Sequence, residues 1–596
     1  MNRLLEGLRR PRVRFACLLA LVVVSVLACN AVTGAGDIIL DDSGTSAAGG
    51  ASSGTLVGQG GANAGAIGAG GSCATTCSPD LHSVIDCNGN TIKECPPDQG
   101  CSPDGSCVSA CESASEHKST FGCDFYSVTP AVIAEARGSC FAVMIANTWN
   151  SDITLSAEYG GQTIDTASYL YTPQGSGGTL SYTATGGLLK QGEFGILFLS
   201  KYESGDVFQT DCPVPQALEM STQLDGTGRG KAFRIRSDRP VVAYDVYPWG
   251  GASSFVTSAT LLLPTPSWGT NFVTSDAWEA LHGNPFTQFV AAQDGTTVTI
   301  VPTNTVNGGG GIPAMAANTA SSFTLNRGEV VQLLQATRLA GSTVQADKPI
   351  AVWGGSSCMN IPSNKVACDG AHQQLLPVQL LGNEYVGVRY PSRGGDDSAP
   401  YTLVGMIDGT QLSYDNMPTG APGSLNRGDV SIFFTDQVFS VASQDADHPF
   451  YVAAHMTGAA TNPSGAGDPE YVNVVPPAQY LPRYLFVTDP TYKNTSLVFV
   501  RQRGSDGDFH DVTLACAGTL SGWTSVGSSG KYEYLQLKLV ENGAGQQGCD
   551  NGVHTAHSDV PFGLTVWGYD KAASYAYPAG MSVDTINTVV VKPVPK

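Results

Sequence analysis

The feature that most constrains the fold of this chain is an Asp-x-Pro segment followed by an apolar run, which occurs four times at similar intervals. An apolar run follows each copy, and the copies are Asp238-Arg239-Pro240, Asp347-Lys348-Pro349, Asp447-His448-Pro449 and Asp559-Val560-Pro561. Because β-forming residues flank each break, each copy predicts a strand, a tight turn and a second strand. Proline is tolerated there, since the first residue of a strand need not donate to the ladder.

The aspartate of each copy cannot accept a bond from the amide two residues on, because that residue is proline. We therefore expect its carboxylate to face solvent or to reach the next amide, that of Val241, Ile350, Phe450 or Phe562. A ligand-binding role is the alternative to this turn-forming role. The middle residue of the segment is Arg, Lys, His or Val, and this tolerance argues against a ligand site.

Other signals recur in the same order between the copies. A proline precedes an aromatic residue by eight positions, an Asp-Gly turn dipeptide follows, and a Leu-Asn-Arg-Gly segment comes next in two copies. The residues concerned are Pro264, Phe272, Pro377, Tyr385, Pro476, Tyr484, Asp294-Gly295, Asp408-Gly409, Asp506-Gly507, 325–328 and 425–428. A weaker unit of the same order precedes them, so the sequence predicts four diverged β repeats of about 105 residues over residues 122–585.

The predicted fold class is all-β. Only 14% of the residues are charged, 71 are glycine, and β-branched and aromatic residues dominate the apolar runs. Four such units would close into a propeller-like ring or stack as tandem β-sandwiches. We favour the ring, because units that repeat the full order of signals must bury faces against their neighbours.

Several segments resemble the amino-terminal domain of the IgG-Fc-binding protein family, which is found in animal mucus proteins and in bacterial surface proteins. The resemblance rests on residues 347–353, 358–377, 382–386 and 561–580, within repeats that fill about three quarters of the chain. One segment departs from the family pattern. Ala371-His372-Gln373 precedes Pro377, where the family leads us to expect more acidic residues. The resemblance implies an extracellular binding or adhesive module, here in a bacterial surface lipoprotein, and it carries over no antibody contact.

The start of the chain, residues 1–28, is typical of a lipoprotein signal peptide. Five arginines precede an apolar run from Phe15 to Ala28, which is too short to span a bilayer comfortably. The run ends in Val26-Leu27-Ala28-Cys29, so we expect Cys29 to carry a lipid anchor; a chance cysteine after an ordinary cleavage site is the alternative. Asn30 favours sorting to the outer membrane, and residues 29–72, rich in Gly, Ala and Ser, predict a flexible tether.

Residues 73–121 predict a small module held by disulfides. Seven cysteines cluster between Cys73 and Cys111, and export favours disulfides over a zinc site built from Cys73, Cys77 and His82. The candidate disulfide cysteines of the chain are Cys73, Cys77, Cys87, Cys95, Cys101, Cys107, Cys111, Cys123, Cys140, Cys212, Cys358, Cys368, Cys516 and Cys549. Two local pairs are expected, Cys358 with Cys368 and Cys516 with Cys549, while the partners of the others stay open.

The charge balance argues against a nucleic-acid partner. The chain carries 31 Lys and Arg against 51 Asp and Glu, a net charge of −20. Loss of residues 1–28, with five Arg and one Glu, would leave 26 against 50, or −24. Nucleic acid and anionic headgroups would repel such a chain, so we expect membrane contact through the lipid anchor.

No residue pattern indicates a catalytic site. His554 and His557 lack the intervening Glu of a zinc protease, and we expect both in solvated loops. The carboxylates Glu193, Glu329 and Asp429 follow turn glycines, so we expect structural roles rather than acid catalysis. No cofactor is expected, although calcium is possible, and its candidate ligands are Asp396, Asp397, Asp506, Asp508 and Asp511.

Together these observations predict a non-enzymatic, surface-anchored binding or adhesion protein on the outer membrane, exposed at the cell surface. Its expected partner is an extracellular protein or glycan. An extracellular hydrolase on a β scaffold, such as a glycosidase, or a structural envelope protein is the alternative. Residues 586–596 are expected to form a tail after the last repeat.

Overall fold

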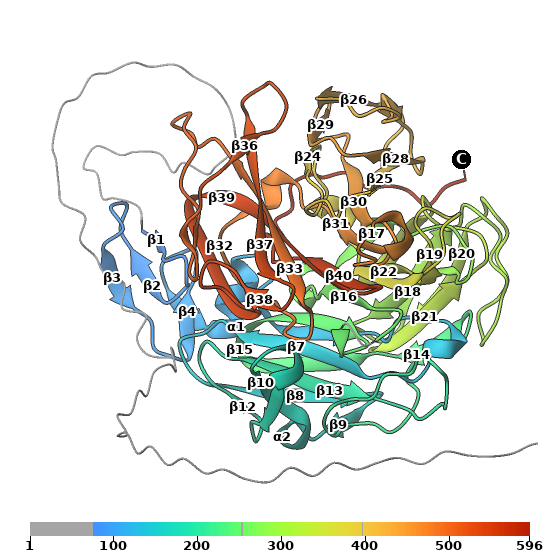
Figure 1. The fold of residues 1–596 in the computed structure, drawn as a ribbon, viewed down its shortest axis with the longest axis horizontal. Helices are drawn as coiled ribbons and strands as arrows, with labels where there is room; N and C mark the ends of the chain where they lie inside the picture. The colour runs from blue at the N-terminus through green and yellow to red at the C-terminus, as the bar shows by residue number, and fades with distance from the viewer. Residues whose placement is uncertain (1–74, 252–253, 396, 596) are drawn as a thin grey trace, which may run out of the picture. The chain divides into compact units, whose positions relative to one another are not determined.

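The computed structural model describes residues 75–251, 254–395 and 397–595, and this part of the chain is nearly all β (Figure 1). The all-β prediction is therefore confirmed. The expected signal peptide, the anchor residue Cys29, the tether, Cys73 and Asp396 lie outside the described residues.

A Cys-rich module precedes the large β domain. Its elements are β1 (Thr76–Cys77), β2 (Ser83–Ile85), β3 (Thr91–Glu94), β4 (Gln99–Cys101), β5 (Cys107–Ser109) and α1 (Ala110–Glu116). The side chain of Ser109 caps α1 by accepting from the amide of Glu112. The module is short of apolar side chains, and its small core is built around buried Val84, Cys95 and Cys101.

The described part of the chain then forms four units. Unit 1 contains β6 (Gly122–Ser127), η1 (Ala134–Ala136), β7 (Phe141–Asn147), β8 (Ile153–Tyr159), β9 (Gln162–Ile164), α2 (Thr166–Tyr169), β10 (Leu170–Gln174), η2 (Gly177–Thr179), β11 (Ser181–Ala184), β12 (Leu188–Leu189), β13 (Phe194–Ser200), β14 (Gly228–Lys231), β15 (Phe233–Tyr247) and β16 (Ser258–Leu261). Unit 2 follows η4 (Thr265–Ser267) and contains β17 (Gly269–Val273), β18 (Pro285–Ala291), β19 (Thr296–Val301), β20 (Ser321–Leu325), β21 (Glu329–Leu334), β22 (Thr343–Met359) and β23 (Asp369–Gln374).

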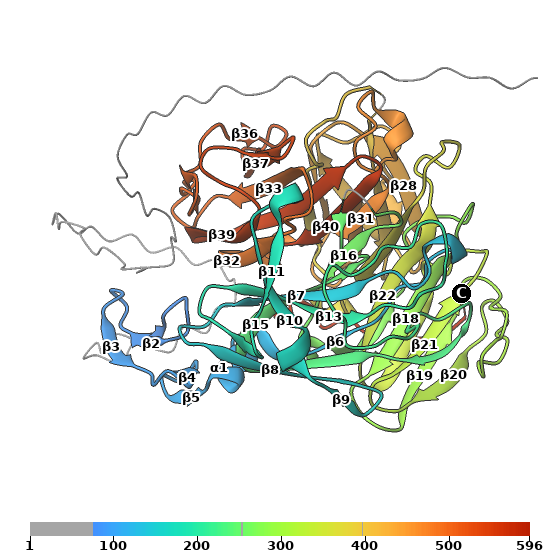
Figure 2. The same ribbon diagram turned by 60° about the horizontal axis from the view of Figure 1, so that its bottom comes forward.

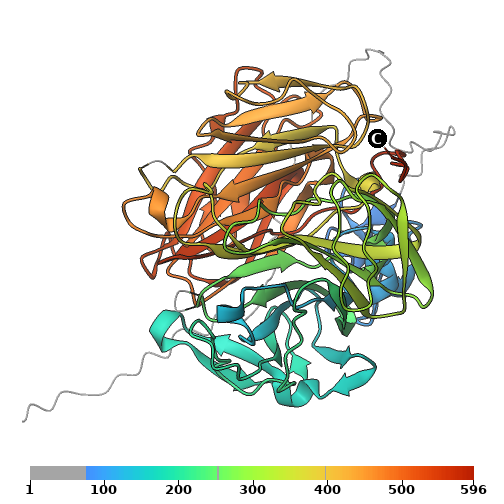
Figure 3. The same ribbon diagram turned by 90° about the vertical axis from the view of Figure 1, so that its right-hand side faces the viewer.

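Units 3 and 4 repeat this order. Unit 3 follows η5 (Val378–Leu380) and contains β24 (Glu384–Gly387), β25 (Ala399–Gly405), β26 (Thr410–Asp415), β27 (Ser424–Leu425), β28 (Val430–Thr435), β29 (Phe439–Ser443), β30 (Phe450–Met456), η6 (Ala459–Thr461) and β31 (Glu470–Asn473). Unit 4 follows η7 (Pro477–Gln479) and contains β32 (Leu481–Thr488), β33 (Asn494–Gln502), β34 (Thr513–Leu514), β35 (Gly518–Thr519), β36 (Thr524–Ser525), β37 (Tyr532–Glu541), β38 (Ala544–Gly545), β39 (Gly552–Asp570) and β40 (Ala573–Pro578). Figure 3 shows the units in their chain colours.

Unit 3 shows the plan of a unit most clearly, because its strands form two separate sheets. One sheet has the order β24-β29-β26-β27 and the other β28-β25-β30-β31. In units 1, 2 and 4 a single long strand takes the place of β29 and β30 and joins the two sheets. In unit 2, the first half of β22 lies between β17 and β19, and its second half lies between β18 and β23. Each unit is thus a pair of sheets, and in units 1, 2 and 4 one strand links the pair by changing sheet.

The Asp-x-Pro segments mark the point where this long strand changes sheet. The predicted tight turn is wrong for three copies, because β15, β22 and β39 run through it as continuous strands with a shift of register. Extra residues bulge out there and bend the strand. The proline, which has no N–H donor, is tolerated in the bulge, and the ladder continues beyond it. Only the copy at Asp447 separates two strands in the described residues.

The aspartates of all four copies are exposed, as one of the two expectations had it, but their predicted turn-forming role is corrected in units 1 and 2. In unit 2, the Asp347 carboxylate accepts from the amide of Thr297 on the neighbouring strand β19, at 2.8 Å. In unit 1, Asp238 accepts from Thr154 on β8 at the same distance. The side chain therefore closes a gap in the ladder beside the bulge instead of capping its own turn.

The recurring aromatic residues hold the same bend from the inside. The Tyr385 hydroxyl donates to the carbonyl of Phe450, at 2.7 Å, and accepts from the amide of Gly382 at 3.0 Å. Tyr484 makes the equivalent pair of bonds in unit 4, to the carbonyl of Phe562 and from the amide of Leu481. The spacing of proline and aromatic in the sequence reflects this anchor.

The last strands of the four units meet at the centre of the domain and close a ring. We call β16, β23, β31 and β40 the innermost strands; β16 contacts β23 and β40, and β31 contacts the same two. Figures 1 and 2 show β16, β31 and β40 close together near the middle of the domain. Side chains join them in turn. The hydrogen bonds run from Gln374 N to Thr260 Oγ1, from Asn473 Nδ2 to Gln374 O, from Ser574 Oγ to Asp468 O and from Thr257 Oγ1 to Ser574 O. The favoured ring and the two-sheet units are therefore both present in one architecture.

The chain ends close the ring. Residues after β40 lie antiparallel to the segment before β6, with a bridge between Ser119 and Ser582. The amide of Thr120 donates to the carbonyl of Met581, and the amide of Val583 donates to the carbonyl of Lys118. Closure therefore depends on contacts between segments at opposite ends of the described chain.

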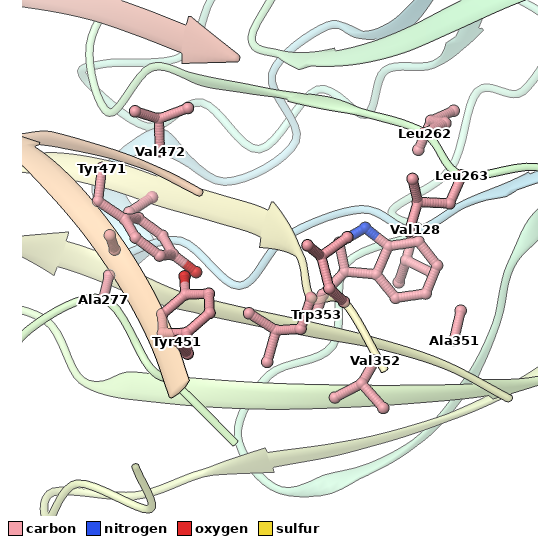
Figure 4. Close-up of a cluster of buried hydrophobic side chains, with 14 of the residues drawn as sticks. Val128, Leu262, Leu263, Ala277, Ala351, Val352, Trp353, Tyr451, Tyr471 and Val472 are labelled. Carbon is pink, nitrogen blue, oxygen red and sulfur yellow. The ribbon is translucent and has the colours of Figure 1, made fainter. Parts of the chain in front are cut away.

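Trp353 shows how the units share a core. It follows the Asp-x-Pro bend of β22, is fully buried, and lies beside Leu262, Leu263 and Val128 (Figure 4). Its ring stacks on that of His372, with centroids 6.1 Å apart. The indole therefore packs against residues from two units at once.

Replacement of Trp353 by Ala should lower the free energy of unfolding by about 3–5 kcal/mol, as expected for a large-to-small change in a packed core. Lys348→Ala is the matched control in the same strand, because the Lys348 ammonium only contacts the carbonyls of Asp294 and Gly295 at the surface. It should change stability by no more than about 0.5 kcal/mol. Urea unfolding with disulfides intact measures both, and equal effects would contradict the packing described.

Candidate functional site

The segments that connect the units border a cavity of about 490 Å³. Its walls come from α1, the start of β6, the turn before β17, the turn before β24 and the C-terminal tail. The lining residues that matter most below are Lys118, Phe121, Asp124, Trp268, Thr270 and Gln379. The cavity thus lies where the Cys-rich module, units 1 and 2 and the tail come together.

The recurring prolines shape this cavity. An added Cβ on Gly122 would lie 2.4 Å from the Cβ of Pro264, and one on Gly269 would lie 2.4 Å from the Cβ of Pro377. Only glycine permits this close approach, so each connecting segment lies directly on the first strand of the preceding unit. The prolines, held in this way, form rigid apolar walls.

The chemistry of the cavity favours binding over catalysis. Lys118 and Asp124 are the charged residues that line it, and both oxygens of the Asp124 carboxylate already accept from Arg234 at 2.8 Å. The Trp268 indole N–H donates to the carbonyl of Leu263, and the residue forms part of the cavity wall. Since no second carboxylate lines this cavity in the described residues, it lacks the pair that a glycosidase needs.

Twelve of the thirteen cysteines in the described residues are joined to one another in six bridges. The pairs are Cys77–Cys101, Cys95–Cys107, Cys111–Cys123, Cys140–Cys212, Cys358–Cys368 and Cys516–Cys549. Both local pairs expected from sequence are present, and Cys87 is also disulfide-bonded. The bridge from Cys111 to Cys123 ties α1 to β6, so it fixes one wall of the cavity.

The three repeat carboxylates have the structural role expected of them. Glu193, Glu329 and Asp429 each lie just after a turn glycine, and the first two accept from the amides of Lys190 and Asn326. Asp429 likewise accepts from the amide of Asn426, at 2.8 Å. Each carboxylate therefore closes the turn in front of it.

The calcium candidates are engaged with protein groups. Asp397 is buried and accepts from the guanidinium groups of Arg389 and Arg393. Asp506 accepts from the amide of Asp508 and lies 2.9 Å from the ring of His510. Among the described residues, no group of three or more His, Cys, Asp or Glu side chains is arranged to hold a metal ion.

The expectation that His554 lies in a solvated loop is wrong. It lies within β39, buried against the ring of Phe486, and burial lowers its pKa to about 4. Its Nε2 lies 3.1 Å from the hydroxyl of Thr488. His557, three residues on, is exposed.

A set of buried acids lies where the innermost strands meet. Burial raises the pKa of Asp468 to about 7 and raises the pKa values of Asp369 and Glu470 well above their usual range. Asp369 accepts from the hydroxyl of Thr257 at 2.9 Å. The ring is therefore held at its centre by carboxyl groups that favour the protonated form.

Comparison with known protein families matches residues 258–568 to the family described as IgGFc binding protein. The match runs from the first residue of β16 into β39 and covers more than half of the chain. The chain belongs to the IgGFc-binding protein family. The human IgGFc-binding protein is 27% identical over 330 residues, which cover 53% of this chain and 6% of the human protein. The resemblance inferred from sequence is thus confirmed, while the chain spans only a small part of this relative.

Sequence reasoning found the prolines of the cavity but missed Lys118, Trp268 and Gln379. The repeated Pro signal marked the connecting segments, yet nothing in the sequence shows that segments so far apart along the chain border one cavity.

A separate observation concerns the membrane: none of the helices in the described residues has the length and apolar character to cross one.

The buried acids predict that stability falls as pH rises. A carboxyl group whose folded-state pKa is raised gives its full stability below its unfolded pKa, near 4, and loses it as pH passes the folded pKa. For Asp468 that window is about pH 4 to 7. Asp468→Asn should therefore gain stability over the wild type at pH 8 but not at pH 4, by chemical denaturation.

Asp98→Asn, at an exposed aspartate of the Cys-rich module, is the control. Its free energy of unfolding should change with pH as that of the wild type does. An Asp468→Asn effect of the same size at both pH values would contradict the raised pKa.

Proposed function

We propose that the ring domain binds an extracellular protein partner at the bacterial cell surface, while a lipid on Cys29 anchors the chain to the outer membrane. The observation that carries the proposal is the cavity between the connecting segments, which has rigid apolar walls, few charges and no free carboxylate pair in the described residues. Family membership supports an extracellular binding role. The relative's name speaks of the Fc part of immunoglobulin G, and Fc is therefore one probe for this chain.

A glycan is the second candidate partner, and hydrolysis the second candidate activity. The sequence leaves a protein and a glycan open as partners, so both classes belong in the test. The mature chain should be placed on arrays of glycans and extracellular proteins, with purified Fc included, beside a broad screen for hydrolase activity. Binding without turnover is the expected result, and turnover of any substrate would contradict the proposal.

Thr270→Arg should weaken capture of the partner by at least about tenfold, equivalent to some 1.4 kcal/mol, because the longer side chain enters the cavity from β17. Thr324→Arg, on exposed β20, is the control and should bind as the wild type does. Titration of immobilised partner measures both affinities. Equal affinities of Thr270→Arg and the wild type would show that the partner does not bind at the cavity.

The anchor has its own test. Cys29→Ser should leave the precursor unprocessed or release the chain into the soluble fraction, because the cysteine sulfur is the site of lipid attachment. Detergent phase partitioning and the mass of the mature chain measure this. A variant of normal mature size that still partitions with detergent would rule out the anchor.

A further inference from the structure

We use the word groove for each junction at which the first strand of one unit lies near the turns of the next unit. The residue before the buried aromatic of each first strand marks the four grooves, and these residues are Asp124, Asn271, Glu384 and Arg483. A Leu-Asn-Arg-Gly turn provides the opposite wall in two grooves, through Arg327 and Arg427. The grooves can therefore be compared position by position.

The C-terminal tail fills the groove between units 2 and 3. The Asn271 side chain bonds to both the amide and the carbonyl of Val591, at 2.7 Å each. The Arg427 guanidinium lies 3.4 Å from the carbonyls of Lys592 and Pro595. The turn arginine thus binds the main chain of an extended segment, which ends near units 2 and 3 (Figure 1).

Two other grooves are also occupied. Between units 3 and 4, the Lys531 ammonium binds both oxygens of Glu384, at 2.6 and 2.7 Å. Between units 4 and 1, Arg483 and the turn residue Trp149 face the Cys-rich module across a cavity of only about 60 Å³. The Trp149 indole donates to the carbonyl of Pro97 in that module, at 2.9 Å.

The groove between units 1 and 2 is different, because no segment of the described chain fills it. It contains a cavity of about 330 Å³, lined by Tyr126, Glu158, Arg234, Arg327 and four small residues, together with Asp294. Strand β14 of unit 1 pairs with β21 of unit 2, and the amide of Ala232 donates to the carbonyl of Gly328. The two walls are therefore held in place without an occupant.

The cavity offers unused hydrogen-bonding groups. The Tyr126 hydroxyl is buried and has no partner among the described residues. Glu158 lies 3.7 Å from the guanidinium of half-exposed Arg327 and 3.8 Å from that of Arg234, so neither contact is a close hydrogen bond. Donors of Arg327 and acceptors of Glu158 remain free for a ligand.

We propose that this groove binds an extended peptide segment of a partner protein, with Arg327 donating to its carbonyls and Glu158 accepting from its amides. The inference rests on the proposed function as a protein-binding domain and names the binding mode. Its basis is the neighbouring groove, where the equivalent Arg427 lies against the carbonyls of such a segment. A peptide group carries both a donor and an acceptor, as the cavity does.

The lining of the cavity carries no net charge. Glu158 and Asp294 are its acidic residues, and Arg234 and Arg327 are its basic ones. The Arg234 guanidinium is already paired with the Asp124 carboxylate. A lining without net charge suits a main-chain segment, because peptide groups are neutral and carry both a donor and an acceptor.

The test uses the full chain and a fluorescent peptide with the sequence of residues 587–595, blocked at both ends. The tail stays in its own groove, so the peptide should occupy the open one and bind saturably at one site per chain, by fluorescence polarisation. Arg327→Ala should lower its affinity at least about tenfold. Arg239→Ala, an arginine of the unit 1 Asp-x-Pro segment outside the cavity, should leave it unchanged.

Three results would overturn the inference: no saturable binding, equal affinity for Arg327→Ala and the wild type, or a loss confined to Asn271→Ala, which would mean that the peptide only exchanges with the tail. Displacement of the peptide by neutral oligosaccharides but not by unlabelled peptide would replace it with a glycan site. If the chain still captures its partner while the peptide fails to bind, this inference fails and the proposed function stands.

Discussion

The structure depends on the Asp-x-Pro segment of each unit, where the chain passes from one sheet to the other. In units 1, 2 and 4 one strand bends there and runs on, and in unit 3 two strands flank the segment. The proline removes a donor that the ladder would otherwise require, the bulge absorbs the change of direction, and in units 1 and 2 the aspartate accepts from an amide on a neighbouring strand. After the bend, each strand leads to an innermost strand at the centre of the ring. The bend therefore couples the core of a unit to the closure of the whole domain.

Sequence reasoning identified the repeats, the all-β class and the family, because these follow from local patterns that recur at fixed intervals. It failed where the outcome depends on distant neighbours. Nothing local shows that Asp347 accepts from Thr297 on another strand, or that His554 is buried in β39. The sequence marked the prolines of the cavity walls but not the cavity, since segments from five parts of the chain form it.

The closed ring also explains where ligands can bind. Closure buries the innermost strands and places the connecting segments and the grooves between units at the surface. The chain uses its own tail, its Cys-rich module and the Lys531–Glu384 ion pair in three grooves. The remaining groove and the neighbouring cavity share the first strand of unit 1, β6, so one partner could contact both.

Closure of the ring makes the four units one body rather than four independent domains. Native-state hydrogen exchange of the innermost strands β16, β23, β31 and β40 tests this closure. If the ring is closed, these strands should exchange only through global unfolding, with the same free energy in all four units. Exchange of one innermost strand at a much lower free energy, with the other three still protected, would contradict the account.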